Sequence, residues 1–323
     1  MVLPSVSVVI PVYNAQDTIA GVIKAVLAQS YQGERELIVV DDGSQDRTAD
    51  EIRVFPQVRY IRQDNTGPAS ARNCGAGMAR GEILFFTDSD CYPEPQWIEK
   101  MIAGFFSDQI AVVAGSYDIA NPKAVLAKAI HAEILFRHHR LMPDFPRAFG
   151  SYNFAIRRKI FDQVGRFNTG YRRASGEDND LSYKILSSGY KIKFQKDALV
   201  AHVHQCDFQK YLQEQFRHGF WRAKRYGDHL QMVAGDDYTF WKDIVEIPLA
   251  LGHGLILFFS GMKGLVVLFL AFEVVWGLVM ARRLGDGLIL GLVMWARSFL
   301  RTAGLFCGAI YFLKYYLRKN KKT

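Results

Sequence analysis

Short apolar runs alternate with amphipathic stretches through the first half of the chain. The apolar runs have the length of strands and predict buried strands over residues 6–10, 37–40, 58–62, 83–86 and 111–115. Between them, helical spacing of apolar residues predicts helices over residues 17–29, 44–53, 68–79 and 95–106, with Ser44 as a cap. Strand and helix in alternation predict crossover connections, a largely parallel sheet and an α/β fold.

From about residue 244 the pattern becomes apolar. Three runs, residues 244–262, 264–281 and 287–313, approach the length that crosses a bilayer, although Glu246, His253 and Glu273 interrupt the first two. We therefore expect an α/β domain over residues 1–243 and hydrophobic membrane helices over residues 244–323.

The third run carries two arginines. Arg297 and Arg301 are four residues apart, which places them on one helical face. Because charges are costly in lipid, this segment is expected to lie in the membrane interface, with Trp295 as an anchor.

The net charge is concentrated at one end of the chain. The formal charge is +8, and residues 282–323 carry nine Lys/Arg against one acid, whereas residues 1–281 carry 31 of each. A basic tail beside apolar segments indicates membrane lipids with anionic headgroups as partners, and does not favour nucleic acid. Arg282-Arg283 and the tail from Lys314 to Lys322 both favour the cytoplasmic side, which two crossings satisfy and three do not. A soluble helical bundle is the alternative.

The cysteines indicate the compartment. The four cysteines form no CxxC pair, and no secretory signal precedes the first strand. A reducing cytoplasm fits these features best.

Acidic pairs follow two of the predicted strands. Asp41-Asp42 comes after residues 37–40, and Asp88-Ser-Asp90 comes after residues 83–86. Open α/β sheets bind ligands at the carboxyl ends of their strands, so we expect both pairs in one crevice. Asp88 and Asp90 suit Mg²⁺ or Mn²⁺, which take few protein oxygens and complete their shells with water and phosphate. A solvated turn before the next helix is the alternative.

The two commonest phosphate loops are missing from the sequence. Gly75-Ala-Gly77 resembles a dinucleotide fingerprint but lies within a predicted helix, and there is no GxxxxGK[ST] motif. A nucleotide bound here would therefore be held by a metal and the acidic pairs.

Seven short motifs stand in a fixed order between residues 5 and 227. They are Ser7-Val-Val-Ile-Pro11-Val-Tyr13-Asn14, Asp41-Asp42-Gly43-Ser44, Asn65-Thr-Gly67 with Ala71-Arg72-Asn73, Ala79-Arg-Gly81-Glu82, Asp88-Ser-Asp90, Asn153-Phe-Ala-Ile-Arg157 and Gly176-Glu177-Asp178-Asn-Asp180-Leu181. In order and spacing they resemble family 2 glycosyltransferases. The resemblance implies a GT-A fold, which is Rossmann-like, together with a nucleotide-sugar donor, a divalent metal and inversion at the anomeric carbon.

The resemblance also implies roles for single residues in donor binding. Asp42 would accept the N3 proton of uracil, Tyr13 would lie against the base, and Arg72 would lie near the base or the phosphates. For Tyr13 the alternative is ordinary aromatic packing at a strand end. The donor-binding set implied is Pro11, Tyr13, Asn14, Asp41, Asp42, Arg72 and Asp88.

The metal ligands implied by the resemblance are Asp88, Asp90 and a histidine. Asp90 is the more direct ligand of the two acids, and His202 is favoured over His204, with a structural histidine as the alternative. In an extended chain His202, His204 and Cys206 would share one face, but three ligands on one strand give poor tetrahedral geometry for structural zinc.

Glu177 and Asp178 open a predicted helix. A carboxylate at a helix N-terminus is electrostatically favoured, so either acid could be a capping residue. The resemblance implies instead that Asp178 is the general base, with Glu177 as the alternative assignment.

These expectations combine into one prediction of function. We expect a membrane-attached inverting glycosyltransferase of the hexosyltransferase type, which moves one sugar from a UDP-linked donor to a lipid-linked or membrane-proximal acceptor. Transfer of a single sugar is favoured because Gln213 to Arg217 and Phe220 to Arg222 only approach the QxxRW motif of polymerising relatives. The alternatives are a nucleotidyltransferase on a related sheet and a catalytically inactive membrane scaffold.

Overall fold

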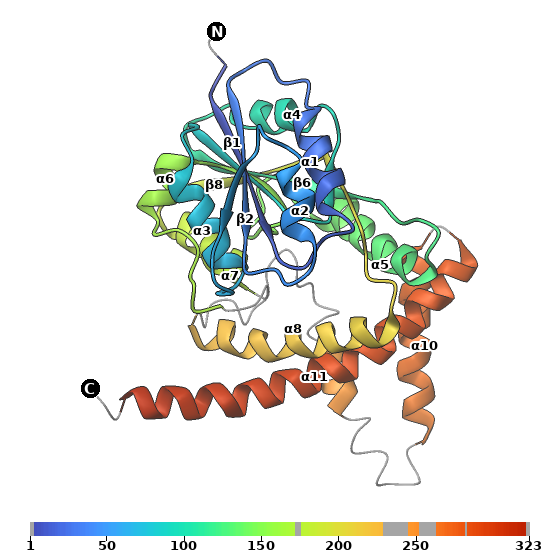
Figure 1. Cartoon of the computed structure of the whole chain (residues 1–323). Coiled ribbons are helices and arrows are strands. Elements are labelled where there is room, and N and C mark those ends of the chain that lie inside the picture. The colour runs from blue at the N-terminus through green and yellow to red at the C-terminus, as the bar shows by residue number, and fades with distance from the viewer. Residues whose placement is uncertain (1–2, 172–175, 229–244, 252–262, 282, 321–323) are drawn as a thin grey trace. The chain divides into compact units, whose positions relative to one another are not determined.

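The computed structural model of the protein describes residues 3–171, 176–228, 245–251, 263–281 and 283–320 (Figure 1). The chain divides into two compact units. The first holds residues Met1–Ala120 and Met142–Val203, and the second holds residues Asn121–Leu141 and His204–Thr323. The predicted domain boundary between residues 243 and 244 lies outside the described residues and stays a prediction.

The first unit is built on an eight-stranded sheet in the order β3-β2-β1-β4-β7-β6-β8-β5. Within the group β3-β2-β1-β4, every pair of neighbouring strands is parallel. Strand β7 runs antiparallel to both β4 and β6. Strand β8 is parallel to β6 and antiparallel to β5. The strands are β1 Val6–Val12, β2 Arg35–Asp41, β3 Arg59–Arg62, β4 Ile83–Thr87, β5 Cys91–Pro93, β6 Ile110–Ile119, β7 Asn153–Arg157 and β8 Lys191–His202. The predicted α/β fold is confirmed, on a sheet that is parallel in its first half and mixed in its second.

Helices cover both faces of this sheet (Figure 1). One face packs on α1, α2 and α4, and the other on α3, α6 and α7. Every residue of β4 is buried, which is expected for a strand covered on both faces. Its Phe85 meets Trp97 edge-on with ring centres 5.0 Å apart, and its Phe86 stacks on Phe154 at 4.8 Å. The helices are α1 Ile19–Leu27, α2 Thr48–Arg53, α3 Pro68–Met78, α4 Trp97–Ala103, α6 Arg158–Gln163 and α7 Glu177–Ser187.

One local prediction is corrected. Helix α2 begins only at Thr48, because the Ser44 hydroxyl accepts a hydrogen bond from the Asn14 amide at 3.0 Å instead of capping the helix. Residues 91–93, where a solvated turn was the alternative, form β5 because they pair with β8. Strand β8 continues to His202, since it pairs with both β6 and β5.

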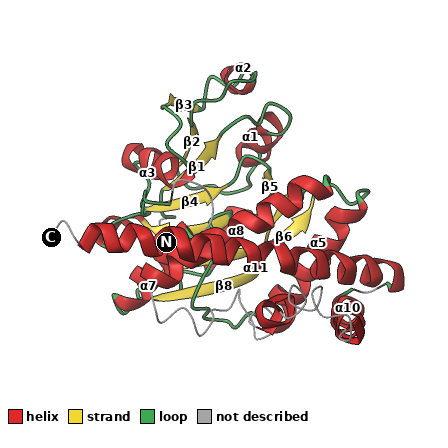
Figure 2. Cartoon of the chain, turned by 90° about the horizontal axis from the view of Figure 1, so that it is seen from below, coloured by secondary structure: helices red, strands yellow, loops and turns green. Residues whose placement is uncertain are grey.

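The second unit is helical. It contains α5 (Val125–Phe136), a π-helical turn (Arg137–Leu141), α8 (Phe208–Asp228), α10 (Lys263–Met280) and α11 (Leu284–Asn320). Figures 1 and 2 show α11 running beside α8. Glycine makes this close packing possible, because a Cβ at Gly304 would lie 2.0 Å from the Phe216 carbonyl oxygen and one at Gly308 would lie 2.2 Å from that of Phe220.

The arginines of α11 point into this unit. The Arg297 guanidinium binds both oxygens of Glu133 on α5, and Arg297 is only 2 % exposed. Burial acts to raise the pKa of Glu133, but the positive charges of Arg297 and Arg137 hold it well below its usual value. Arg301 Nε donates to Gln215 Oε1 of α8 at 2.8 Å. The polar interruptions of the third apolar run therefore serve packing between helices.

One described helix is long and apolar enough to cross a membrane. It covers Leu284–Lys314 within α11, and 44% of its most apolar window is buried in the structure. The apolar part of α10, Val267–Met280, is shorter, and the run 244–262 lies largely outside the described residues. Because a core helix of a soluble protein meets the same criterion, the number of crossings stays a prediction.

Candidate active site

The carboxyl ends of β1, β2 and β4 meet at one edge of the sheet, since these strands are parallel neighbours. A cavity of about 230 Å³ opens there. It is lined by Pro11, Val12, Tyr13, Asp42, Pro68, Arg72, Asp88, Ser89 and Asp90. The structure thus brings six of the predicted site residues to one cavity, namely Pro11, Tyr13, Asp42, Arg72, Asp88 and Asp90.

Asp42 is a fixed acceptor in the cavity wall. Its Oδ1 accepts hydrogen bonds from the Thr66 amide at 2.9 Å and from Gln63 Nε2 at 2.7 Å, and its Oδ2 accepts one from the Gly67 amide at 2.8 Å. A carboxylate can accept about four hydrogen bonds, so one position is left for a ligand. Gly67 has a φ of 101°, which a side chain would strain. The Asn65-Thr-Gly67 motif therefore orients Asp42.

Asp41 and Asn14 do not line the cavity. Asp41 Oδ2 accepts hydrogen bonds from the Tyr60 hydroxyl at 2.8 Å and from Arg62 at 2.7 Å. Asn14 has a φ of 50°, and its side-chain oxygen accepts a hydrogen bond from the Gln45 amide at 2.8 Å. Both residues fix the loops that carry Tyr13 and Asp42, and a direct role for either in donor binding stays a prediction.

Arg72 connects two parts of the site that are far apart in sequence. Its Nη2 donates to Asp88 Oδ1 at 2.7 Å, and its Nη1 donates to Glu177 Oε1 at 2.9 Å. The guanidinium carbon lies 5.5 Å from the centre of the Phe167 ring, and Arg72 is 1 % exposed. Burial acts to lower the pKa of Arg72, but Asp88 and Glu177 hold it above its usual value. Arg72 is therefore a permanently charged bridge between α3, the end of β4 and the start of α7.

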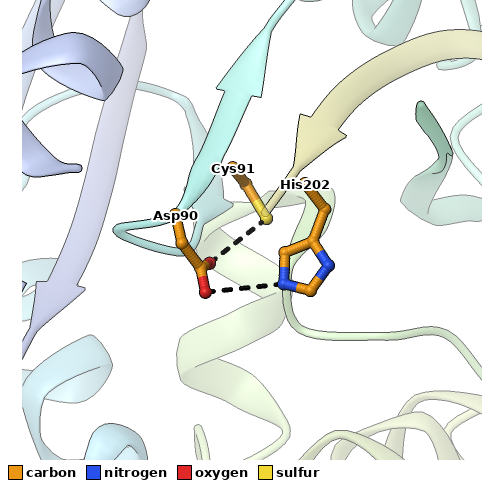
Figure 3. Close-up of side chains that lie close together, drawn as sticks. All are labelled: Asp90, Cys91 and His202. Atoms are coloured by element: carbon orange, nitrogen blue, oxygen red, sulfur yellow. Dashed lines mark hydrogen bonds and ion pairs between the residues drawn. The ribbon is translucent and has the colours of Figure 1, made fainter. Parts of the chain in front are cut away.

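Asp90 lies beside His202 and Cys91 (Figure 3). Asp90 Oδ2 is 3.5 Å from His202 Nε2, and Cys91 Sγ is 3.6 Å from Asp90 Oδ1. Burial acts to raise the pKa of Asp90, but the hydrogen bond and charge of His202 lower it below its usual value. One donor atom from each of these three residues lies within 4.8 Å of the other two, so the set fits a divalent cation. The structure brings together two of the three predicted metal ligands, while Asp88 pairs with Arg72.

Stacked aromatic rings support His202. The Tyr117 ring lies 5.0 Å from the imidazole and stacks on Tyr152 at 3.6 Å. His204 instead lies in the second unit, where its Nε2 is 3.3 Å from His131 Nδ1. The arrangement of His202, His204 and Cys206 on one strand face does not form, because β8 ends at His202.

The two acids at the start of α7 differ in their surroundings. Glu177 is 1 % exposed and is held by Arg72 and by the Gly176 amide, which donates to Glu177 Oε2 at 3.1 Å. Asp178 is half-buried, and its carboxylate accepts hydrogen bonds from the amides of Asn179 at 2.8 Å and Ser151 at 3.4 Å. Glu177 is committed to a buried ion pair, whereas Asp178 keeps contact with solvent.

Sequence reasoning missed Cys91 and the bridge made by Arg72. The adjacency of Cys91 to Asp90 was a signal for the first. The second had no local signal, because Arg72 and Glu177 are 105 positions apart.

The sequence matches known proteins over this region. The model of the family described as Glycosyl transferase family 2 matches residues 7–165. The chain is 30% identical over 223 residues to glycosyltransferase AglE of Haloferax volcanii, covering 67% of this chain and 72% of that protein. It is 25% identical over 267 residues to the glucosyl-dolichyl phosphate glucuronosyltransferase of the same organism, covering 75% and 83%.

The fold also matches a solved structure. The mannosyltransferase PcManGT from Pyrobaculum calidifontis, in complex with GDP-Man and Mn²⁺, superposes with a TM-score of 0.54 at 20% sequence identity. The match covers 71% of this chain and 67% of that one, and shows that the two share a fold.

Proposed function

Since the chain belongs to glycosyl transferase family 2 and is a glycosyltransferase, we propose that it moves one sugar from a nucleotide-sugar donor to a lipid-linked or membrane-proximal acceptor. The observation that carries the proposal is the bridge made by Arg72. It joins Asp88 in the cavity wall to Glu177, the residue next to Asp178. A donor held in the cavity would therefore lie near the half-buried carboxylate of Asp178.

Asp42 and Tyr13 bind the base of the donor in this proposal. The remaining acceptor position of Asp42 suits an imide N–H such as N3 of uracil, so we propose a UDP-linked donor. Tyr13 is 46% exposed at the cavity, so its ring is available for stacking on a base.

A divalent cation, Mg²⁺ or Mn²⁺, is held by Asp90 and His202 in this proposal. When bound, such an ion neutralises the diphosphate and so stabilises the leaving group. The mixed carboxylate and imidazole donor set is the support from this chain, and PcManGT was solved with Mn²⁺. Asp88, paired with Arg72, lines the same cavity and would contact the donor directly or through water.

Asp178 acts as the general base. It takes the proton from the acceptor hydroxyl as that oxygen forms a bond to the anomeric carbon. The bond from the anomeric carbon to the diphosphate breaks, and the nucleoside diphosphate leaves. A single displacement inverts the anomeric carbon and needs one carboxylate, while Glu177 keeps Arg72 in place.

Membrane attachment brings the enzyme to its acceptor. The apolar helix within α11 and the basic tail support attachment to the cytoplasmic face of the cell membrane, with catalytic residues in the cytoplasm. One relative is named for a glucosyl-dolichyl phosphate, which is a lipid-linked acceptor. Gln215 lies within the segment that approaches the QxxRW motif, and its side chain accepts a hydrogen bond from Arg301. This contact supports a role for the segment in helix packing instead of polymer synthesis, and so supports the transfer of a single sugar.

The exchange Asp178→Asn tests the proposal. Nucleotide sugars are screened with the full-length protein and membrane lipids, with mass spectrometry of the products. For the donor that reacts, Asp178→Asn should lower single-turnover transfer by about 10²–10⁴-fold and leave donor affinity nearly unchanged, because the amide oxygen can keep the shorter hydrogen bond, from the Asn179 amide, while the amide accepts no proton.

Glu177→Gln is the matched control. It should weaken folding through the loss of the charge on the buried partner of Arg72, and any folded fraction should still transfer sugar. Near-normal transfer by Asp178→Asn, together with collapse in folded Glu177→Gln, would move the base to Glu177.

A further inference from the structure

We propose that Cys91 is a third ligand of the metal site, and that its thiol makes the site bind Zn²⁺ or Cd²⁺ in preference to Mn²⁺ or Mg²⁺. The inference rests on the proposed metal site at Asp90 and His202. It adds that thiophilic ions displace the ion that supports transfer, and so inhibit the enzyme.

The pairing of two strands places Cys91 at the site. Cys91 of β5 lies directly opposite His202 of β8 in an antiparallel ladder. Residues opposite each other in such a ladder have side chains on the same face with Cβ atoms about 4.5–5.5 Å apart. Asp90 directly precedes Cys91, so its carboxylate closes the third side of the group, and Figure 3 shows the thiol and the imidazole both directed toward it.

The distances between donor atoms match a coordinated ion. With Zn–N and Zn–O bonds near 2.1 Å and Zn–S bonds near 2.3 Å, tetrahedral geometry places nitrogen and oxygen about 3.4 Å apart and sulfur and oxygen about 3.6 Å apart. The observed separations are 3.5 Å from His202 Nε2 to Asp90 Oδ2 and 3.6 Å from Cys91 Sγ to Asp90 Oδ1. These two distances run to different oxygens of Asp90, and the three donor atoms lie within 4.8 Å of one another, so the side chains would still have to close around an ion.

The donor set favours thiophilic ions. Affinity for nitrogen, oxygen and sulfur sites rises from Mn²⁺ to Zn²⁺, and a thiolate strengthens this preference. A thiol binds a metal ion as the thiolate, so the Cys91 thiol must lose its proton on binding. The sulfur–metal bond then forms as this proton leaves to solvent.

An ion would enter this site through Asp90, which lines the cavity, whereas Cys91 does not. Cys91 itself is 0 % exposed, but the Asp90 side chain is 41 % exposed and lines the cavity. Asp90 therefore meets the ion first. Three protein ligands leave one tetrahedral position for water or a phosphate oxygen, as in sites that bind substrate.

The test is a titration of the full-length protein with Cd²⁺, followed by the ultraviolet charge-transfer absorbance of a cadmium–thiolate bond. The wild-type protein and the control Cys74→Ala, which removes a cysteine from α3, should both give the band, and Cys91→Ala should lose it. Zn²⁺ affinity should fall at least about tenfold in Cys91→Ala, since even residues behind a metal ligand change affinity by 10–100-fold. Mn²⁺ affinity should stay within about twofold, because Mn²⁺ prefers oxygen donors.

Cys91→Ser guards against loss of folding, because it keeps the volume of the side chain. Its thermal unfolding should resemble that of the wild type, and it should lose the band as Cys91→Ala does. A wild-type protein that binds Mn²⁺ but gives no cadmium–thiolate band, or a Cys91 variant that keeps wild-type Zn²⁺ affinity, overturns the role of Cys91 alone. Failure of both Mn²⁺ and Cd²⁺ to bind the wild-type protein overturns the proposed metal site itself.

Discussion

Arg72 is the residue on which the charge balance of the cavity depends. It is buried with two carboxylates, and one of them, Glu177, is as buried as Arg72 itself. Removing one partner of a buried pair leaves an uncompensated charge, which costs more than the pair itself contributes. Arg72 is therefore required first for the stability of the folded site, whatever its part in the reaction.

We expect Arg72→Met to lower the free energy of unfolding by about 3–5 kcal/mol, because Glu177 would stay buried without a counter-charge. Urea titration of the full-length protein measures this change. Arg53→Met is the matched control, since Arg53 forms an exposed pair with Asp50 at 3.2 Å. It should change stability by no more than about 1 kcal/mol. Equal effects in the two variants would show that the bridge contributes little.

At the scale of elements, α11 is bound to α5 by ion pairs of two kinds. The pair Arg297–Glu133 is buried, whereas Lys128 and Asp286 join the same two helices at 3.7 Å with side chains 39 % and 26 % exposed. The two pairs thus differ in their access to water and share the same partner helices.

We expect Arg297→Met to destabilise the protein by about 3–5 kcal/mol, because it leaves Glu133 buried with less compensating charge. Adding Glu133→Gln to Arg297→Met should recover part of this loss, with a coupling of about 0.5–3 kcal/mol in a double-mutant cycle. Lys128→Met should cost at most about 1 kcal/mol. Thermal unfolding of the wild type, Arg297→Met, Glu133→Gln, the double variant and Lys128→Met gives the comparison. Additive effects of Arg297→Met and Glu133→Gln would refute the coupling.

The elements that the sequence predicts best are those with a strong local pattern. Strands β1, β2 and β4 are continuous apolar runs because both of their faces are buried, and their ends correctly placed Asp42, Asp88 and Asp90 at one cavity. Strand β5 has only three residues and contains Pro93, so nothing local distinguishes it from a turn. Strand β5 forms only because it pairs with β8, which is more than a hundred residues later in the chain. The placement of Cys91 depends on the same pairing.

For the whole molecule, the concentration of positive charge in residues 282–323 predicts a preference for membranes that contain anionic lipid. We expect the full-length protein to float with vesicles that contain anionic lipid, and to bind neutral vesicles more weakly. Replacing Arg318, Lys319, Lys321 and Lys322 with Gln should lower binding to anionic vesicles at least about tenfold at low salt, since each cation near such a surface contributes about 1 kcal/mol. Exchange of four Lys or Arg residues in 1–120 provides the control. Equal binding by the tail variant would place the attachment elsewhere.

The interleaving of the two compact units along the chain has a consequence for protein synthesis. Residues 121–141, with Glu133, leave the ribosome between the two halves of the first unit. The partner of Glu133, Arg297, follows 164 residues later, which takes roughly 8–30 s at translation rates of about 5–20 residues per second. During that interval strands β1 to β8 have all been synthesised, and Glu133 has Arg137, four residues along the chain, as a neighbouring cation. A chain that ends before α11 lacks Arg297, so its Glu133 cannot form the buried ion pair. No single cut of the chain therefore yields the sheet together with an α5 that is paired to α11.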